Sequence, residues 1–482
     1  MAEWTREGSA VDKPLWQRDA VELAALTRSG MVSCREVMES HVARMEAVNP
    51  SLNAVVLSLA NEALDRADDL DRARLKGEPM GPLHGVPITT KVNTDQIGTP
   101  TDNGVVAFKD VIAPGDNPCI ANLKDAGAIP IGRTNTPAFS MRWHTSNALH
   151  GETLNPWHAG HTPGGSSGGA SSSVSAGIAP IGQGNDIAGS VRYPAYCCGL
   201  VGVRPTFGRV PAFNPSAPAP RPISAQLMAV QGPLTRSVQD ARVALEAMSK
   251  GSSEDARWVD EPLVGPPLPK PTRVALVANP AGRGVNPEIS AAVHQAGQWL
   301  EDAGFVVEEI EPPELGEVAD LWAKIGMDDV IGSLEGPIEE YGDDGIKAAV
   351  GFWRQGSPVV GPQGVLDALM ARDRFSRLWQ LFLEDYPLIV MPSSGEPAFP
   401  INLDTAGFEA YQRLWRAQLP QLVLPVLGLP GVAVPTGVHE GLPVGVQISS
   451  RRYREDWCLD AAEIIEMRAD IALPIDPRAP EA

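Results

Sequence analysis

Residues 162–195 read TPGGSSGGASSSVSAGIAPIGQGNDIAGSVRYPA, and this stretch decides the fold of the 482-residue chain. Ser166 and Ser190 lie in two glycine-containing turns, 24 residues apart. Glycine permits positive φ and keeps side chains away from a hydroxyl that a substrate must approach. A flexible Gly/Ser linker is the simplest interpretation of this composition, but Val174 and Ile181 favour a packed segment. The pattern therefore predicts two serine-bearing turns joined by a short helix.

Three motifs together resemble a known family. GGSSGGA at 164–170 and GNDIAGSVRYPA at 184–195 resemble the amidase signature family of serine amidohydrolases, including the spacing of the two serines. Residues 81–93, GPLHGVPITTKVN, are similar to the lysine motif of the same family. The resemblance implies an α/β fold, with a single large mixed β-sheet covered by helices on both faces.

The resemblance also implies a catalytic site. Members of this family hydrolyse amides with a Ser-Ser-Lys triad, in which one serine attacks the carbonyl carbon and a second serine relays protons to the lysine. The matching residues are Ser190 as nucleophile, Ser166 as bridging serine, Lys91 as base, and the backbone N–H groups of Ile187, Ala188, Gly189 and Ser190 as the oxyanion hole.

Lys91 must be neutral to act as a base. A lysine ordinarily titrates near about 10.4, so burial away from carboxylates has to lower its pKa.

The resemblance further implies a cis peptide between Gly165 and Ser166. No cofactor is expected, because a serine and a lysine can supply the nucleophile, base and acid. No metal is expected either, since the histidines between 144 and 161 match no tight zinc spacing.

Four positions depart from the family pattern. Val92 and Ala138 replace acidic residues, Asn185 replaces a threonine, and Ala188 replaces a common glycine. None of these changes removes a catalytic group. If the two missing carboxylates would have lain near Lys91, their absence favours its neutral form. We expect the departures to affect substrate identity more than activity.

The implied reaction is cleavage of a C–N bond in linear amides, aryl acylamides or carbamates. Bacterial urethane-cleaving members of the family have similar motifs. Met141 and Trp143 follow the turn at 136–139 and are candidate substrate contacts. The expected partner is a small-molecule amide or carbamate, bound by a monomer or homodimer.

Three other functions stay open at this point. The family also includes the glutaminase subunit of a tRNA-dependent amidotransferase, which needs a partner chain. Residues 164–168 also fit the G-x-S-x-G elbow of an α/β-hydrolase esterase that would use Ser166, with His294 or His439 downstream. An inactive binding scaffold would keep the fold without turnover, although a complete triad argues against it.

Composition restricts the class of partner and the compartment. A net charge of −20 disfavours a nucleic-acid partner, because phosphates would be repelled. Five scattered cysteines do not form a disulfide framework and indicate a reducing compartment. The N-terminus lacks a basic region followed by an apolar run, and no stretch is long and apolar enough to span a bilayer. We therefore expect a cytoplasmic protein without membrane association.

Family-like motifs from about residue 20 to about residue 460 predict one large domain, although the length alone would suggest about three. Within it, Trp322, Trp353 and Arg354 suggest contacts, but the sequence does not indicate with what. Aromatic positions of this kind are typical of a core, and a substrate-pocket wall or lid is the competing role of the segment. The expected divisions are a loose segment at 1–15, an amidase domain at 16–472 with the variable segment at 317–367, and a proline-rich tail at 473–482.

Alternating strand and helix patterns agree with an α/β class. Ser33 and Glu36 have the spacing of a capping box that opens a helix. Buried strands are expected at 85–91, 128–132, 388–392 and 431–435, and a closing strand at 441–447.

Overall fold

Local capping signals determine where several helices begin. The Ser33 hydroxyl accepts from the Glu36 N–H, and the Glu36 carboxylate accepts from the Ser33 N–H, so the predicted capping box at the start of α2 (Cys34–Leu52) is confirmed. Asn117 caps α4 (Pro118–Asp125) with its side-chain oxygen. These short-range bonds satisfy N–H groups that the first helical turn leaves free.

The structure is a computed structural model that describes residues 13–217 and 219–478. Most of the expected loose segment 1–15, and the last four residues of the expected tail 473–482, lie outside the described residues. In the described part of the tail, backbone N–H groups of Ile475 and Arg478 donate to carbonyls of the domain.

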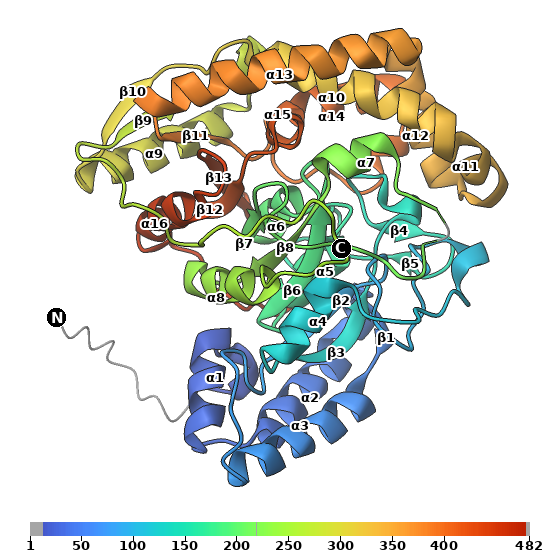
Figure 1. Cartoon of the computed structure of the whole chain (residues 1–482), viewed down its shortest axis with the longest axis vertical. Helices are drawn as coiled ribbons and strands as arrows, with labels where there is room; N and C mark the ends of the chain where they lie inside the picture. The colour runs from blue at the N-terminus through green and yellow to red at the C-terminus, as the bar shows by residue number, and fades with distance from the viewer. Residues whose placement is uncertain (1–12, 218, 479–482) are drawn as a thin grey trace.

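Strands from the whole length of the described chain join one large mixed sheet, which crosses the molecule (Figure 1). Eleven strands among the described residues follow the order β1-β3-β2-β6-β8-β7-β12-β13-β11-β9-β10, and a separate hairpin pairs β4 with β5. The large sheet contains β1 (Val55–Ser58), β2 (Pro87–Lys91), β3 (Ile129–Thr134), β6 (Ile181–Asp186), β7 (Val201–Arg204), β8 (Val230–Thr235), β9 (Arg273–Leu276), β10 (Val306–Glu309), β11 (Leu388–Pro392), β12 (Gly431–His439) and β13 (Leu442–Ser449); the hairpin contains β4 (Ser146–Asn147) and β5 (Gly151–Glu152).

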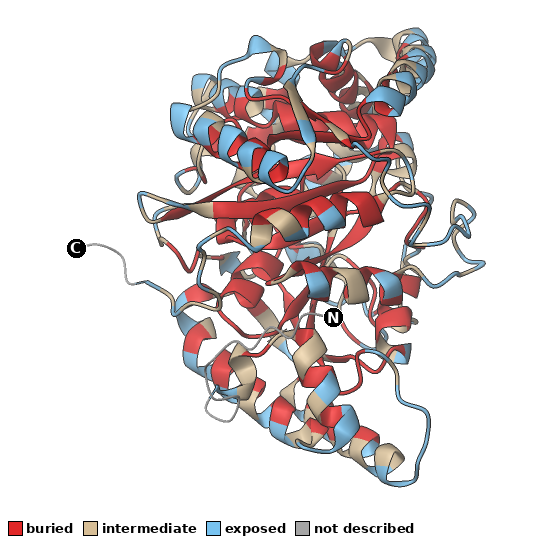
Figure 2. Cartoon of the chain, turned by 90° about the vertical axis from the view of Figure 1, so that its left-hand side faces the viewer, coloured by how far each residue is buried: buried red, intermediate tan, exposed pale blue. Residues whose placement is uncertain are grey.

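Both faces of the sheet are buried. In β11, Leu388 and Val390 join one hydrophobic cluster, whereas Ile389 and Met391 join another. Alternate residues of a strand point to opposite faces, so an unbroken apolar run is expected where both faces are covered. Figure 2 shows the buried sheet between layers of half-exposed helices. The predicted α/β fold, with helices on both faces of one mixed sheet, is confirmed.

The helices divide between these two faces and one end of the sheet. The cluster with Leu388 draws mostly on α1, α4, α8, α9 and α16, the cluster with Ile389 draws on α5 to α7, on α10 to α15 and on the other side of α9, and α2 with α3 pack beside β1. The remaining bounds are α1 (Ala20–Ser29), α3 (Ala60–Leu75), α5 (Gly168–Ser175), α6 (Arg192–Cys198), α7 (Ile223–Met228), α8 (Val238–Met248), α9 (Pro287–Asp302), α10 (Leu315–Asp329), α11 (Glu335–Tyr341), α12 (Asp344–Gly356), α13 (Gly361–Asp385), α14 (Phe408–Ala417), α15 (Leu419–Leu427) and α16 (Glu455–Glu466).

The variable segment 317–367 is almost entirely helical, from α10 through the π-helical turn Val330–Leu334 to the start of α13. It covers one end of the molecule, together with α14 and α15 (Figure 1). Within the described part of the chain, no helix combines the length and apolar character needed to cross a membrane.

Candidate active site

Two neighbouring parallel strands bring the lysine motif beside the second serine turn. β2 pairs in parallel with β6 through Ile88 with Ile181 and Thr89 with Gly182. Lys91 is the last residue of β2, and β6 ends at Asp186 just before the turn that carries the second serine. Because parallel strands end at the same sheet edge, both motifs reach one site.

The turn that carries Ser166 needs glycine on its inner side. A Cβ on Gly165 would lie 2.4 Å from the Arg142 carbonyl oxygen, so any side chain there would force this oxygen to move. The Gly165–Ser166 peptide is cis, as the resemblance implied. Thr136 donates its hydroxyl to the Ser166 carbonyl at 2.9 Å, which helps to hold the serine in place.

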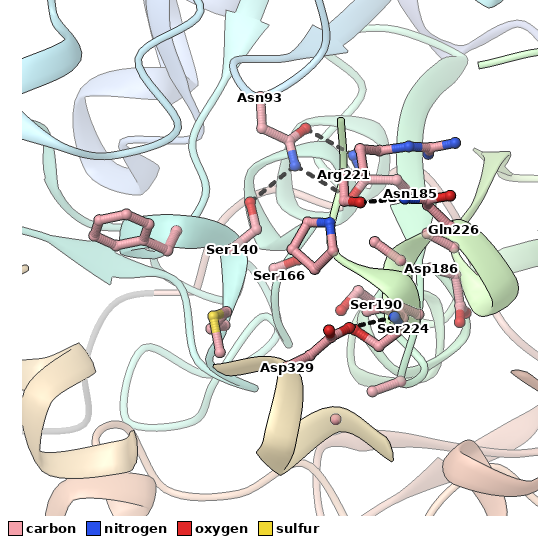
Figure 3. Close-up of a pocket in the computed structure, with 18 of the residues that line it drawn as sticks. Asn93, Ser140, Ser166, Asn185, Asp186, Ser190, Arg221, Ser224, Gln226 and Asp329 are labelled. Atoms are coloured by element: carbon pink, nitrogen blue, oxygen red, sulfur yellow. Dashed lines mark hydrogen bonds between the residues drawn. The ribbon is translucent and has the colours of Figure 1, made fainter. Parts of the chain in front are cut away.

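Lys91 donates three side-chain hydrogen bonds in this site. Its Nζ lies 2.7 Å from Ser166 Oγ, 2.9 Å from Asn185 Oδ1 and 3.2 Å from Ser167 Oγ. All three acceptors are uncharged. Asn185 is further held by Asn93, whose Oδ1 accepts from Asn185 Nδ2 at 2.7 Å (Figure 3).

The surroundings of Lys91 favour its neutral form. The side chain is fully buried, and this burial lowers its pKa well below the ordinary 10.5, although the charge of Asp186 acts in the opposite direction. Among the described residues Lys91 forms no ion pair with a carboxylate. Burial of this kind favours the neutral amine, the form of a lysine that can act as a base.

Asp186 is neutralised by two arginines from other parts of the site. Arg192 Nε lies 3.0 Å from Asp186 Oδ2, and Arg204 Nη1 lies 3.2 Å from Oδ1. Burial disfavours the charged carboxylate, but these two arginines together lower the pKa of Asp186 to about 2. Most of the negative charge near Lys91 is thereby compensated.

The turn from Ile187 to Ser190 links β6 to α6. Gly189 has φ +91°, a conformation that favours glycine, and its N–H donates to Asp186 Oδ1 at 3.0 Å. In the described structure the N–H groups of Ile187, Ala188 and Ser190 have no hydrogen-bond partner. Gly189 is also absent from the cavity lining, which includes the other three residues. Of the four expected oxyanion donors, the Gly189 N–H thus already donates to Asp186, whereas the other three are free within the described residues.

A cavity of about 540 Å³ opens over both serines. Ser166 and Ser190 line it together, and both are almost fully buried (Figure 3). Elsewhere in the lining, the Ser224 N–H of α7 donates to the Asp329 carboxylate of α10 (Figure 3). A cavity of this size suits a small organic molecule.

One side of the cavity is built from large aromatic rings, here called the aromatic wall. Trp322 and Trp353 stack with ring centroids 5.3 Å apart, and Trp415 lies 5.9 Å from each of them. The aromatic wall consists of Trp143, Trp322, Trp353, Tyr411 and Trp415.

The sequence-based candidates for substrate contact have mixed positions. Met141 and Trp143 both line the cavity, as does Trp353. Arg354, which was also expected to make contacts, instead pairs with Glu335 at the surface and does not line the cavity. A helix exposes neighbouring residues on different faces, so Trp353 and Arg354 cannot both point inward.

Several lining residues were missed by the sequence. Trp415 and Tyr411 lie on α14, far along the chain from the motifs, and a single sequence gives no signal that would bring them to the serine turns. Asn185 was noted only as a departure from the family pattern, although it donates to Asn93 and accepts from Lys91.

A family model described as Amidase matches residues 36–459 of the chain. The chain belongs to the amidase family. The indoleacetamide hydrolase of Bradyrhizobium diazoefficiens is 47% identical over 95% of this amidase and 88% of the relative. The acylamidase of Rhodococcus erythropolis is 32% identical over 93% and 94% of the two chains. A bacterial aryl acylamidase of known structure superposes with a TM-score of 0.82 at 26% identity, covering 96% of this chain and 98% of that one. This amidase is accordingly a hydrolase of amide C–N bonds.

Family membership overturns the α/β-hydrolase alternative. That interpretation needed His294 or His439 beside Ser166. Both histidines are partly exposed, His294 beside Glu309 and His439 beside Glu288, and neither lines the cavity of the amidase.

Proposed function

We propose that this amidase cleaves its substrates through an acyl-enzyme on Ser190, with Ser166 and Lys91 relaying protons. The observation that carries the proposal is the 2.7 Å contact between a fully buried Lys91 and Ser166, beside a cavity that Ser190 also lines. A neutral lysine is a competent base, and a bridging hydroxyl lets it act on a second serine.

In the first half-reaction Ser190 Oγ bonds to the substrate carbonyl carbon. Its proton passes to Ser166 Oγ while the Ser166 proton passes to Lys91 Nζ. The tetrahedral intermediate then expels the leaving nitrogen, which takes a proton back along the same path. Water repeats these steps on the acyl-enzyme, and the carboxylic acid leaves with Ser190, Ser166 and Lys91 restored.

The oxyanion of each tetrahedral intermediate needs preorganised donors. We assign this role to the N–H groups of Ile187, Ala188 and Ser190, since these have no partner in the described part of the chain and their residues line the cavity. Gly189 serves instead to close the turn against Asp186.

We further propose that the acyl group carries a planar aromatic ring. The aromatic wall offers faces and edges for stacking beside the serines, and relatives of this chain include an indoleacetamide hydrolase and an acylamidase. Arylacetamides are therefore the preferred substrate class, with Met141 and Trp143 among the contacts.

All five cysteines are free and buried, which agrees with a reducing compartment, and the cytoplasm remains our proposed location.

A substrate panel tests this proposal. Burying one aromatic ring contributes about 1.5–3 kcal/mol, so kcat/KM for indoleacetamide and phenylacetamide should exceed that for acetamide by about 10- to 100-fold. Aryl carbamates, with a similar carbonyl, and glutamine, the substrate of an amidotransferase subunit, belong in the same panel. If the protein prefers a carbamate or glutamine, that substrate class would replace the arylacetamides. If it hydrolyses none of these compounds, the alternative of an inactive binding scaffold would be favoured.

Peptide mapping after reaction with a fluorophosphonate identifies the nucleophile. We expect modification at Ser190 in the wild-type protein and much slower modification in Lys91→Ala. Modification at Ser166 instead would contradict the assignment of Ser190.

Asn185 offers a test of the charge around Lys91. Replacing it with aspartate puts a carboxylate at the position that now lies 2.9 Å from Lys91 Nζ. An opposite charge at this distance raises a lysine pKa by about 1–3 units. We therefore expect Asn185→Asp to lower kcat/KM at pH 7 by about 10- to 100-fold and to move the acid limb of its pH profile upward.

The matched control is Asn185→Thr, which introduces the residue that the family pattern has at this position and adds no charge. It should keep the pH profile of the wild type. Equal shifts in both variants would indicate that Asn185 acts through its shape and not through the charge state of Lys91.

A further inference from the structure

Each carbonyl of the turn before Ser190 accepts a hydrogen bond from a different donor. The Asp186 carbonyl accepts from Arg204 at 2.7 Å, and the Gly189 carbonyl accepts from the Tyr193 N–H at 2.7 Å. The two carbonyls between them accept from indole N–H groups: Trp322 donates to Ile187 at 2.7 Å, and Trp143 donates to Ala188 at 3.0 Å.

A hydrogen bond to a carbonyl also fixes the N–H of the same peptide. In a trans peptide the C=O and N–H groups point in opposite directions. The Ala188–Gly189 peptide is thus held on both sides, because its carbonyl accepts from Trp143 and its N–H donates to Asp186. Among residues 13–217 and 219–478, only Trp322 bonds to the Ile187–Ala188 peptide, and the N–H of this peptide, that of Ala188, is free and points away from the Trp322 indole.

We propose that Trp322 is a positioning residue, which orients the Ala188 N–H as an oxyanion donor through its bond to the Ile187 carbonyl. This inference rests on the proposed function, since it needs attack by Ser190. Trp322 is 7% exposed, so its bond is shielded from competing water. The bond also polarises the Ile187–Ala188 peptide and makes its N–H a stronger donor.

The same indole belongs to the aromatic wall, which ties substrate binding to the oxyanion turn. Trp322 comes from α10, in the segment that the sequence marks as variable, whereas the turn belongs to the family motif. A ring that packs against Trp322 therefore contacts the side chain that sets the Ala188 peptide plane.

Trp353 provides a matched control in the same stack. Its ring lies 5.3 Å from that of Trp322 and also lines the cavity, but its Nε1 is buried without a hydrogen-bond partner among the described residues. Replacing either tryptophan with phenylalanine keeps an aromatic ring and removes an indole N–H. Only in Trp322→Phe does this removal free a carbonyl of the oxyanion turn.

The experiment compares wild type, Trp322→Phe and Trp353→Phe in three measurements. These are kcat and KM for phenylacetamide, the Kd of benzylboronic acid, and the Kd of indole. Boron accepts a lone pair from Ser190 Oγ and becomes tetrahedral, so the boronate reports on the oxyanion site. Indole has no carbonyl and reports on the aromatic wall alone.

Removing an oxyanion donor outright costs about 10²–10³ in kcat, so its misorientation in Trp322→Phe should cost about 10-fold or more. We expect benzylboronic acid to weaken by a similar factor, whereas KM and the Kd of indole change only as much as in Trp353→Phe. The ratio of the two Kd values is independent of the folded fraction, so partial misfolding does not imitate this result.

The positioning role would be overturned if the ratio of the boronate Kd to the indole Kd were equal in Trp322→Phe and Trp353→Phe. An unchanged kcat in Trp322→Phe would overturn it as well. A wild-type protein that neither hydrolyses arylacetamides nor binds the boronate would instead refute the proposed function. The two failures are therefore distinguishable.

Discussion

Ser190→Ala is expected to abolish amide hydrolysis, lowering kcat/KM by about 10⁴- to 10⁶-fold, the range seen when a nucleophilic serine is removed from a catalytic unit. The variant lacks the oxygen that would bond to the carbonyl carbon, while Lys91 and Ser166 keep their 2.7 Å contact. Steady-state hydrolysis of phenylacetamide measures the loss. Thermal unfolding should show little change, because only one small hydroxyl at the cavity surface is removed.

Ser166 and Ser167 distinguish the roles of the hydroxyls near Lys91. Ser167 Oγ lies 3.2 Å from Lys91 Nζ, but Ser167 does not line the cavity. Ser167→Ala should therefore retain most activity, whereas Ser166→Ala should lose about 10²- to 10⁴-fold, the usual contribution of positioned proton transfer. More than one hundredth of wild-type activity in Ser190→Ala would assign the attack to another hydroxyl.

Lys91 is expected to make the stability of this amidase depend on pH. Burial lowers the pKa of Lys91 in the folded protein, whereas in the unfolded chain it titrates near about 10.4. Between these two values the unfolded chain binds one more proton at this residue, so rising pH favours the folded state. One proton changes the free energy of unfolding by about 1.4 kcal/mol per pH unit.

Lys91→Met removes this contribution and isolates it from other groups. The free energy of unfolding of the wild type minus that of Lys91→Met should increase as the pH rises from 7 to 9, at up to about 1.4 kcal/mol per unit. Urea unfolding at several pH values measures this difference. A difference that stays constant would mean that Lys91 is charged in the folded protein, which would rule it out as the base.

The acid limb of the kcat/KM profile provides an independent check on the same residue. Below the pKa of the folded-state Lys91 the lysine is protonated and cannot accept the serine proton, so kcat/KM should fall about tenfold per pH unit. The pKa of Lys91 obtained from this acid limb should equal the pKa obtained from the difference in unfolding free energy between the wild type and Lys91→Met.

Much of the architecture could be predicted from short-range signals. The capping box at Ser33, the buried strand at 388–392 and the helix between the two serine turns all occur as expected. Each depends on neighbouring residues, because capping bonds, apolar runs and glycine turns form within a few positions of the chain. The motifs at 81–93 and 162–195 likewise identified the family that the whole chain matches.

The oxyanion turn shows where such prediction stops. The sequence indicated four N–H donors at the turn, but the direction of each depends on groups from other elements. Gly189 donates to Asp186, and the two carbonyls before Gly189 accept from Trp143 and Trp322, which lie 45 and 135 residues away in sequence. The direction of an N–H group is set by the plane of its peptide, which no local pattern specifies.

By itself the sequence determined the fold class, the family and the three candidate catalytic side chains, because these are encoded in local motifs. Tertiary structure alone decided which side chains bond to Lys91, that Tyr411 and Trp415 complete the aromatic wall, and which N–H groups are left free for an oxyanion. These features require segments far apart in the chain to meet, such as Trp143 with Trp415. Apolar spacing predicts that a tryptophan is buried, but only the packed structure determines whether its ring faces the core or a substrate.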